Sequence, residues 1–86
     1  MTQQVSVNSD GWTLISSGNT RGILENTAGV ALKVRVETVG TVVSDAEKWG
    51  HNLTSNNVFT WERSTVGVDI LARTVSGEGN VLVSAG

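Results

Sequence analysis

The sequence predicts an all-β protein, an antiparallel β-sandwich with a jelly-roll-like arrangement of about seven or eight short strands. Three observations support this fold class. Apolar and polar residues alternate with a period of two in several segments, as in strands with one buried face. Fourteen of the 86 residues are valine, which favours strands. The chain has ten glycines and no proline, so its turns must form at clusters of Gly, Asn, Asp and Ser.

The N-terminal segment predicts two strands separated by a turn. Val5 and Val7 alternate with polar residues, and the stretch NSDG at 8–11 ends in Asp-Gly, a strong turn signal. In the following segment, GWTLIS, Trp12 and Leu14 share one face of an extended chain. We expect Trp12 to be a core residue.

The next two predicted strands lie at 21–26 and 29–37, each preceded by a turn cluster, SSGNT and NTAG. Alternation in the second of these strands separates an apolar face from a polar one. The apolar face carries Val30, Leu32, Val34 and Val36. Residues 38–57 are the least regular part of the chain, and the stretch SDAEKW within them fits either one helical turn or a loop.

Regular alternation returns in NVFTWERS, where Phe59 and Trp61 share a face and predict an aromatic cluster. The segment TVGVDILART follows, and SGEGN at 76–80 is a glycine turn before a last strand that we expect to pair inside a sheet. The apolar face of TVGVDILART carries Val66, Val68, Ile70 and Ala72. We expect this stripe to pack face to face against the apolar face of 29–37, which supplies the main driving force at about 25 cal/mol per Å².

Length and composition narrow the functional classes. We expect one domain over residues 1–86, whose small size favours oligomerisation because disulfides are excluded by the lack of cysteine. The formal net charge of −2 and the scattered Lys and Arg residues argue against a nucleic-acid partner. No apolar run reaches the roughly 18 residues of a membrane span, and the N-terminus lacks the pattern of a signal peptide. One histidine and no cysteine argue against a metal site, and no cofactor is expected.

Catalytic motifs are not evident, so the protein is not expected to be an enzyme. His51 is the single histidine, and no serine occurs in a G-x-S-x-G elbow. The eight carboxylates are not embedded in a pattern that would bring two of them together. Glycine turns such as GEGN lack the Lys-Ser/Thr and the following helix of a phosphate-binding loop.

Partner binding is the more plausible role for the aromatic and basic residues. Trp49, in the irregular segment, either packs under its own loop or contacts a partner, and tryptophan is enriched in interface hot spots. Lys33, Arg35 and Glu37 share one face, which is either a solvated surface or one that meets another chain. A second basic pair, Arg63 and Arg73, is expected on neighbouring strands. The candidate interface residues are Trp49, His51, Trp61, Arg63, Lys33 and Arg35.

Four stretches together resemble a known family. They are WTLISSG at 12–18, LENTAGVALKVRV at 24–36, LTSNNVFTW at 53–61 and ILARTVSGEGNVLVS at 70–84. This pattern is similar to that of the small all-β structural proteins of tailed bacteriophages, which form capsid-decorating or fibre-associated β-sandwiches. In place of a Pro-Gly turn before the aromatic strand, this chain has Ser55-Asn56-Asn57.

The resemblance implies a structural role in a virion and no catalytic residues. It implies an oligomer, with a trimer favoured, that binds the phage major capsid protein or another virion protein and stabilises the capsid. The protein would be made in the host cytoplasm and located on the capsid surface. The alternative is a carbohydrate- or receptor-binding module of a phage fibre. In that alternative Trp49, His51 and Trp61 form a stacking platform for a glycan, with hydrogen bonds from Asn52, Asn56 and Asn57.

Overall fold

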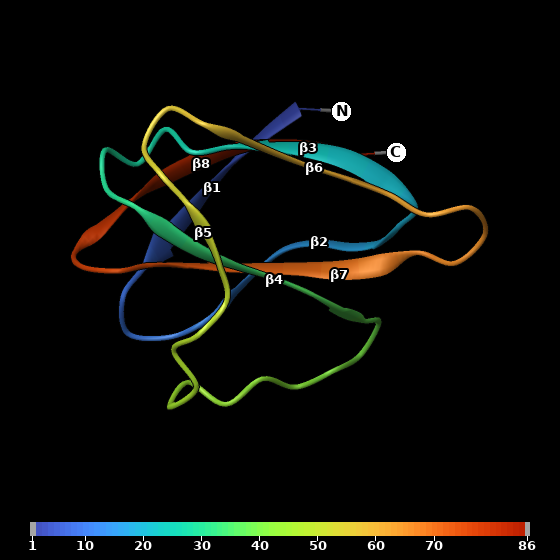
Figure 1. Cartoon of the computed structure of the whole chain (residues 1–86), viewed down its shortest axis with the longest axis horizontal. Helices are drawn as coiled ribbons and strands as arrows, with labels where there is room; N and C mark the ends of the chain where they lie inside the picture. Colours follow the sequence, from blue (N-terminus) through green and yellow to red (C-terminus); the bar gives the residue numbers. More distant parts are fainter. Residues whose placement is uncertain (1, 86) are drawn as a thin grey trace.

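The computed structural model describes residues 2–85 and contains two four-stranded antiparallel sheets (Figure 1). The first, sheet A, has the order β1-β8-β3-β6, formed by Thr2–Asn8, Glu78–Ala85, Arg21–Glu25 and Val58–Glu62. The second, sheet B, has the order β2-β7-β4-β5, formed by Thr13–Asn19, Val68–Thr74, Leu32–Thr38 and His51–Leu53. The predicted all-β antiparallel sandwich is therefore confirmed. Among the described residues, no helix is long and apolar enough to cross a bilayer.

The pairing of the strands follows a jelly-roll scheme. β1 pairs with β8, β2 with β7, β3 with β6 and β4 with β5, so each strand meets a partner counted from the opposite end of the chain. The chain thus resembles one long hairpin rolled up so that alternate strand pairs fall into different sheets. The remaining contacts, β3 with β8 and β4 with β7, complete the two sheets. This is the double-sheet architecture found in viral capsid and lectin domains.

The core lies between the sheets, which Figure 1 shows as two layers. Leu24 and Val81 of sheet A face Leu32, Val34 and Ile70 of sheet B, and all five are fully buried. Valine, leucine and isoleucine suit these positions because branched side chains pack well on a pleated surface. Burial of this apolar area favours folding by about 25 cal/mol per Å².

Two stripes that were expected to face each other lie instead in the same sheet. β4 and β7 are neighbours in sheet B, with Val34 opposite Ala72 and Val36 opposite Ile70. Val66 precedes β7 and is exposed. The expectation was wrong because alternation shows which residues share a face but not which strands are adjacent. The two stripes share the inner face of sheet B and pack against sheet A.

Two tryptophans occupy positions that differ from those expected from alternation. Trp12 is not a core residue: it is half-buried just before β2, and Ile15 points into the core instead. Trp12 shares its face with Leu14, as alternation predicts, but this is the outer face of sheet B, because Thr13 and Ile15 lie on the side of buried Ala72. Trp61 is buried on the inner face of sheet A, where its ring lies against Gly22. Its neighbour on that face, Phe59, pairs with His51 instead, at 6.3 Å between ring centroids.

A fully buried asparagine joins three segments at one end of the sandwich. The side-chain amide of Asn26 donates to the carbonyls of Val30, at 2.8 Å, and Leu53, at 2.9 Å. Its side-chain oxygen accepts a hydrogen bond from the amide of Ala28 at 3.0 Å. Asn26 therefore fixes the turn between β3 and β4 and connects it to the end of β5.

Candidate functional site

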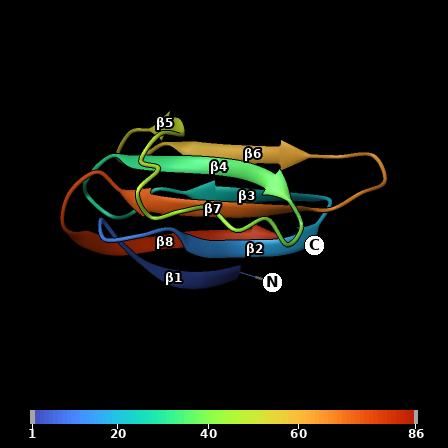
Figure 2. The same cartoon turned by 90° about the horizontal axis from the view of Figure 1, so that it is seen from below.

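Residues 39–50, here called the covering loop, lie over the outer face of sheet B. Figure 1 shows this segment on the far side of sheet B from sheet A, and in Figure 2 it passes in front of β4 and β7. It contains a turn at Ser44–Glu47, where the amide of Glu47 donates to the carbonyl of Ser44 at 3.0 Å, and no helix. Of the two readings of SDAEKW, the loop is therefore the one observed.

Two arginines and two tryptophans form an alternating stack beneath and within the covering loop. The guanidinium of Arg35 lies 3.8 Å from the ring centroid of Trp49 and 5.7 Å from that of Trp12. The guanidinium of Arg73 lies 5.4 Å from the centroid of the Trp12 ring. Cation–π contacts of this kind stabilise most where the cation is shielded from water. Both arginines are buried, whereas Trp49 is 65% exposed.

Carboxylates of β4 and the covering loop neutralise Arg35. Its Nε donates to Glu37 at 2.7 Å and its Nη1 donates to Glu47 at 3.1 Å. The hydrogen bond that Arg35 donates to Glu37 is the largest cause of a raised pKa for Arg35, so the guanidinium stays charged. Arg35 therefore connects β4 to the covering loop through Glu47 and Trp49.

Polar contacts hold both ends of the covering loop. Buried Asp69 of β7 accepts hydrogen bonds from the Ser17 hydroxyl at 2.7 Å and from the amide of Gly40 at 2.9 Å. These two hydrogen bonds, that from Ser17 first, lower the pKa of Asp69 and favour its charged form. Further along the loop, the indole of Trp12 donates to the carbonyl of Glu47 at 2.7 Å.

A shallow groove of about 250 Å³ opens beside Trp49. It is lined by residues of β4, by the end of the covering loop and by the start of β5: Val34, Arg35, Val36, Glu37, Trp49, Gly50 and His51. The structure thus brings together three of the predicted interface residues, Trp49, His51 and Arg35. The exposed indole provides a flat apolar surface, and His51 and Glu37 add hydrogen-bonding groups beside it.

The other predicted interface residues lie elsewhere. Lys33 is on the same outer face of sheet B, where its Nζ donates to the side chain of Asn52. Arg63 is exposed after β6 and donates to the carbonyl of Glu62. The expectation that Arg63 and Arg73 lie on neighbouring strands was wrong, because β6 and β7 belong to different sheets.

Trp61 cannot belong to an exposed platform in this structure. It is 4% exposed, and its indole nitrogen donates inward to the carbonyl of Asn19 at 3.4 Å. The platform expected from Trp49, His51 and Trp61 therefore reduces to Trp49 and His51. Trp61 faces inward because it shares the inner face of sheet A with Gly22, whose missing side chain leaves room for the ring.

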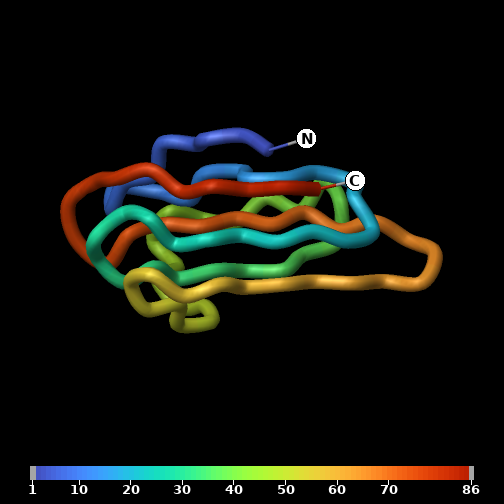
Figure 3. Tube along the Cα trace, turned by 90° about the horizontal axis from the view of Figure 1, so that it is seen from above, coloured from blue at the N-terminus to red at the C-terminus, as the bar shows by residue number. Residues whose placement is uncertain are grey.

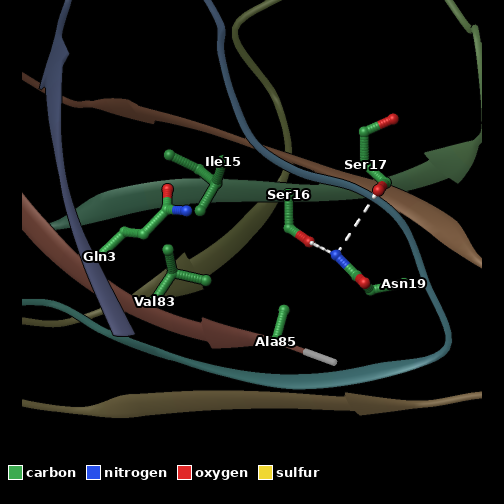
Figure 4. A pocket seen from close by; sticks show the side chains of 7 residues that line it. All are labelled: Gln3, Ile15, Ser16, Ser17, Asn19, Val83 and Ala85. Carbon is green, nitrogen blue, oxygen red and sulfur yellow. Dashed lines mark hydrogen bonds between the residues drawn. The ribbon is translucent and has the colours of Figure 1, made fainter. Parts of the chain in front are cut away.

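A second cavity, of about 240 Å³, lies where sheets A and B approach each other near β1, β2 and β8 (Figure 4). Its lining comprises Gln3, Ile15, Ser16, Ser17, Asn19, Val83 and Ala85. The side-chain amide of Asn19 donates to the hydroxyl of Ser16 at 2.8 Å, so part of its polar lining is internally satisfied. Within residues 2–85, no three His, Asp or Glu side chains converge to hold a metal ion.

The strand order and the two-layer core define this protein as a jelly-roll β-sandwich. Among solved structures, the chain is similar to one described as the crystal structure of PirA. The TM-score is 0.66 and the sequence identity 14%, with 99% of this chain and 93% of that chain covered. At this identity the likeness concerns the fold alone. No protein-family model and no curated protein sequence matches the chain.

Proposed function

We propose that this protein is a structural component of a bacteriophage particle, a capsid decoration protein that forms an oligomer, with a trimer favoured. It binds the major capsid protein or another virion protein and stabilises the particle. The four stretches that resemble small phage structural proteins support this proposal. The jelly-roll architecture agrees with it by analogy, since viral capsid domains often use this fold.

The open outer face of sheet A is the observation that carries the proposal. Figure 3 views the molecule from this side and shows β1, β8, β3 and β6 next to each other, with no described segment lying across them. The register places Ile23, Val58 and Leu82 on this face, among Thr, Ser, Gln, Asn and a few charged residues. Ile23 is 42% exposed and Val58 is 49% exposed. Glu25 lies between Val58 and Leu82 on this face, so apolar and polar residues are interspersed, as in a non-obligate protein–protein interface.

This face is assigned to the contacts between subunits. Sheet B is already covered on its outer side by residues 39–50, whereas sheet A has no such cover. A small domain without disulfides gains stability by burying a further sheet face. An oligomer of such subunits would engage several identical sites on a capsid lattice at once, and the resulting avidity compensates for a modest affinity per site.

Light scattering coupled to size-exclusion chromatography tests the assembly. The wild-type protein should elute as an oligomer at micromolar concentration, and Ile23→Glu should shift it to a monomer that remains folded. Val42→Glu is the matched control, because it introduces the same charge on a valine that is 93% exposed in the covering loop. A monomeric wild type would overturn the assignment. Mass spectrometry of purified particles tests the virion location directly.

The groove beside Trp49 favours a second candidate function, a carbohydrate- or receptor-binding module. The centroid of the exposed Trp49 ring lies 3.8 Å from the Arg35 guanidinium, and His51 and Glu37 line the same groove. A rigid aromatic surface next to hydrogen-bonding groups suits the apolar face of a sugar ring. This candidate would use Trp49 and His51 without Trp61.

Glycan-array binding tests this second candidate. Binding should be lost in Trp49→Ala and kept in Val42→Ala, which truncates another exposed residue of the covering loop. Circular dichroism of both variants should match that of the wild type. A wild-type protein that binds no glycan would remove this candidate and leave the virion proposal untouched.

A further inference from the structure

A groove of about 350 Å³ lies on the outer side of sheet B at the edge of the covering loop, distinct from the groove beside Trp49. Three basic residues line it: Lys33 of β4, Lys48 of the covering loop and Arg73 of β7. Ser9, Thr74 and Val75 complete the lining. This local concentration of positive charge contrasts with the net charge of −2 of the whole chain.

The register of sheet B brings two of these cations together. Lys33 and Arg73 are directly opposite each other on the neighbouring strands β4 and β7. Side chains in this relationship have Cβ atoms roughly 4.5–5.5 Å apart, and like charges placed there destabilise a sheet. Lys48 adds a third positive charge from the covering loop.

No carboxylate compensates these charges within the described residues. Both ion pairs of this surface involve Arg35, and Lys33, Lys48 and Arg73 form none among residues 2–85. Arg73 is only 3% exposed. Its two hydrogen bonds go to main-chain carbonyls, from Nη1 to Asp45 at 2.8 Å and from Nη2 to Ser9 at 2.6 Å. A buried guanidinium without a counter-ion is costly, which distinguishes Arg73 from the neutralised Arg35.

Hydrogen-bond donors are available in the same groove. The Ser9 hydroxyl makes no hydrogen bond among the described residues, and Lys48 makes none. Lys33 donates one of its three N–H groups to Asn52 and keeps two for another acceptor. Charge-assisted donors of this kind bind carboxylate and phosphate oxygens strongly.

We infer that the groove formed by Lys33, Lys48 and Arg73 binds an oxyanion, a carboxylate or a phosphate group. Lys33 and Lys48 contact its oxygens, and Arg73 supplies a fixed positive charge beneath it. The bound anion removes the repulsion between Lys33 and Arg73 that the free protein carries. This site is independent of the proposed virion role, because it concerns a different surface from the open face of sheet A.

Nuclear magnetic resonance titration of the full chain tests the site with two probes, inorganic phosphate and an acetylated triglutamate peptide. Potassium chloride at matched ionic strength is the reference. Saturable shifts of the Lys48, Thr74 and Val75 amides are expected with at least one probe. Saturation with phosphate alone identifies a free phosphate site, and saturation with the peptide identifies a carboxylate of a protein partner.

Two variants make the test specific. The double variant K33Q/K48Q should weaken the affinity by about tenfold or more, because two charge-assisted contacts are lost. Arg63→Gln is the matched control, since it removes an exposed positive charge outside the groove and should leave the affinity unchanged. Without anion, Lys33→Gln should leave the melting temperature unchanged or raise it. Absence of saturable shifts with both probes, or equal affinity in all variants, would overturn the inference.

Discussion

Replacing Asn26 with alanine is expected to destabilise the protein more than any surface substitution of the same size. The wild-type side chain makes three hydrogen bonds while fully buried: two donated to the carbonyls of Val30 and Leu53, and one accepted from the amide of Ala28. Alanine removes all three hydrogen bonds and leaves the backbone groups that made them without a partner inside the structure.

The size of the effect follows from the environment of each partner. The hydrogen bond to Leu53 is buried, and leaving that carbonyl unsatisfied costs about 1–3 kcal/mol. The other two bonds are partly buried and are worth about 1 kcal/mol each. The expected loss is therefore about 3–5 kcal/mol, a large share of the roughly 5–15 kcal/mol that stabilises a typical domain.

Urea unfolding followed by tryptophan fluorescence measures this loss. With an m-value of about 1–1.5 kcal/mol per M, the midpoint should fall by roughly 3 M. Asn80→Ala is the matched control, because that asparagine is exposed and its side chain makes no hydrogen bond among the described residues. If the two variants differ by less than about 1 kcal/mol, the reasoning about buried polar groups at this site is refuted.

Asn26→Asp provides an independent check of the same reasoning. The aspartate keeps the acceptor for Ala28 but places a carboxylate against two carbonyl oxygens, which raises its pKa in the folded state. A group with a raised folded pKa stabilises the protein more as the pH falls, so this variant should become more stable on acidification from about pH 7 to about pH 5. Stability that does not change over this range would contradict the predicted contacts.

Three further substitutions test other parts of the structure. Asp69→Asn should lower the melting temperature near neutral pH. The lowered pKa of Asp69 stabilises the folded protein above the unfolded pKa of about 3.9, and this stability is lost as the pH falls through the folded pKa. Thermal melts of wild type and variant should therefore converge in acid. Gly22→Ala should cost roughly 1–3 kcal/mol in urea unfolding, because its Cβ would overlap the Trp61 ring. Gly18→Ala is the comparison, because its Cβ would meet no atom and only the positive φ opposes it. Arg35→Lys keeps the charge but loses the guanidinium contact with Trp49, so amide hydrogen exchange in the covering loop should accelerate. Unchanged exchange rates would contradict the role given to the stack.

The fold class was predictable because period-two alternation and valine content are local signals. They identified the strands around Val7, Leu24, Val34 and Val81 correctly. They did not identify strand neighbours, because β4 and β7 meet through a pairing between distant parts of the chain. Alternation also does not show which face of a strand is the inner one, so Trp12 lies outside the core while Ile15, on the opposite face, lies in it.

The candidate site was predictable only in part. Trp49 and His51 were identified because an irregular segment between regular strands commonly carries function. The burial of Arg35 and Trp61 was not predicted. Alternation places Arg35 on a polar strand face and Trp61 on an apolar one, but it does not show what covers either face. The role of Asn26 in the NTAG turn was also missed, because its hydrogen-bond partner at Leu53 is distant in sequence.

The two outer faces of the sandwich differ in what covers them and in the side chains that they expose. On sheet B, residues 39–50 cover the outer face and bury Arg35 and Arg73. The loop supplies Glu47 as a counter-ion for Arg35 but supplies none for Arg73. The uncompensated charge therefore sits where the cover ends, beside Lys33 and Lys48. No described segment lies across the outer face of sheet A, where Ile23 and Val58 are exposed. Because the proposed anion groove and the proposed subunit contact lie on opposite sides of the sandwich, the two binding events should not compete, and Ile23→Glu should leave oxyanion affinity unchanged.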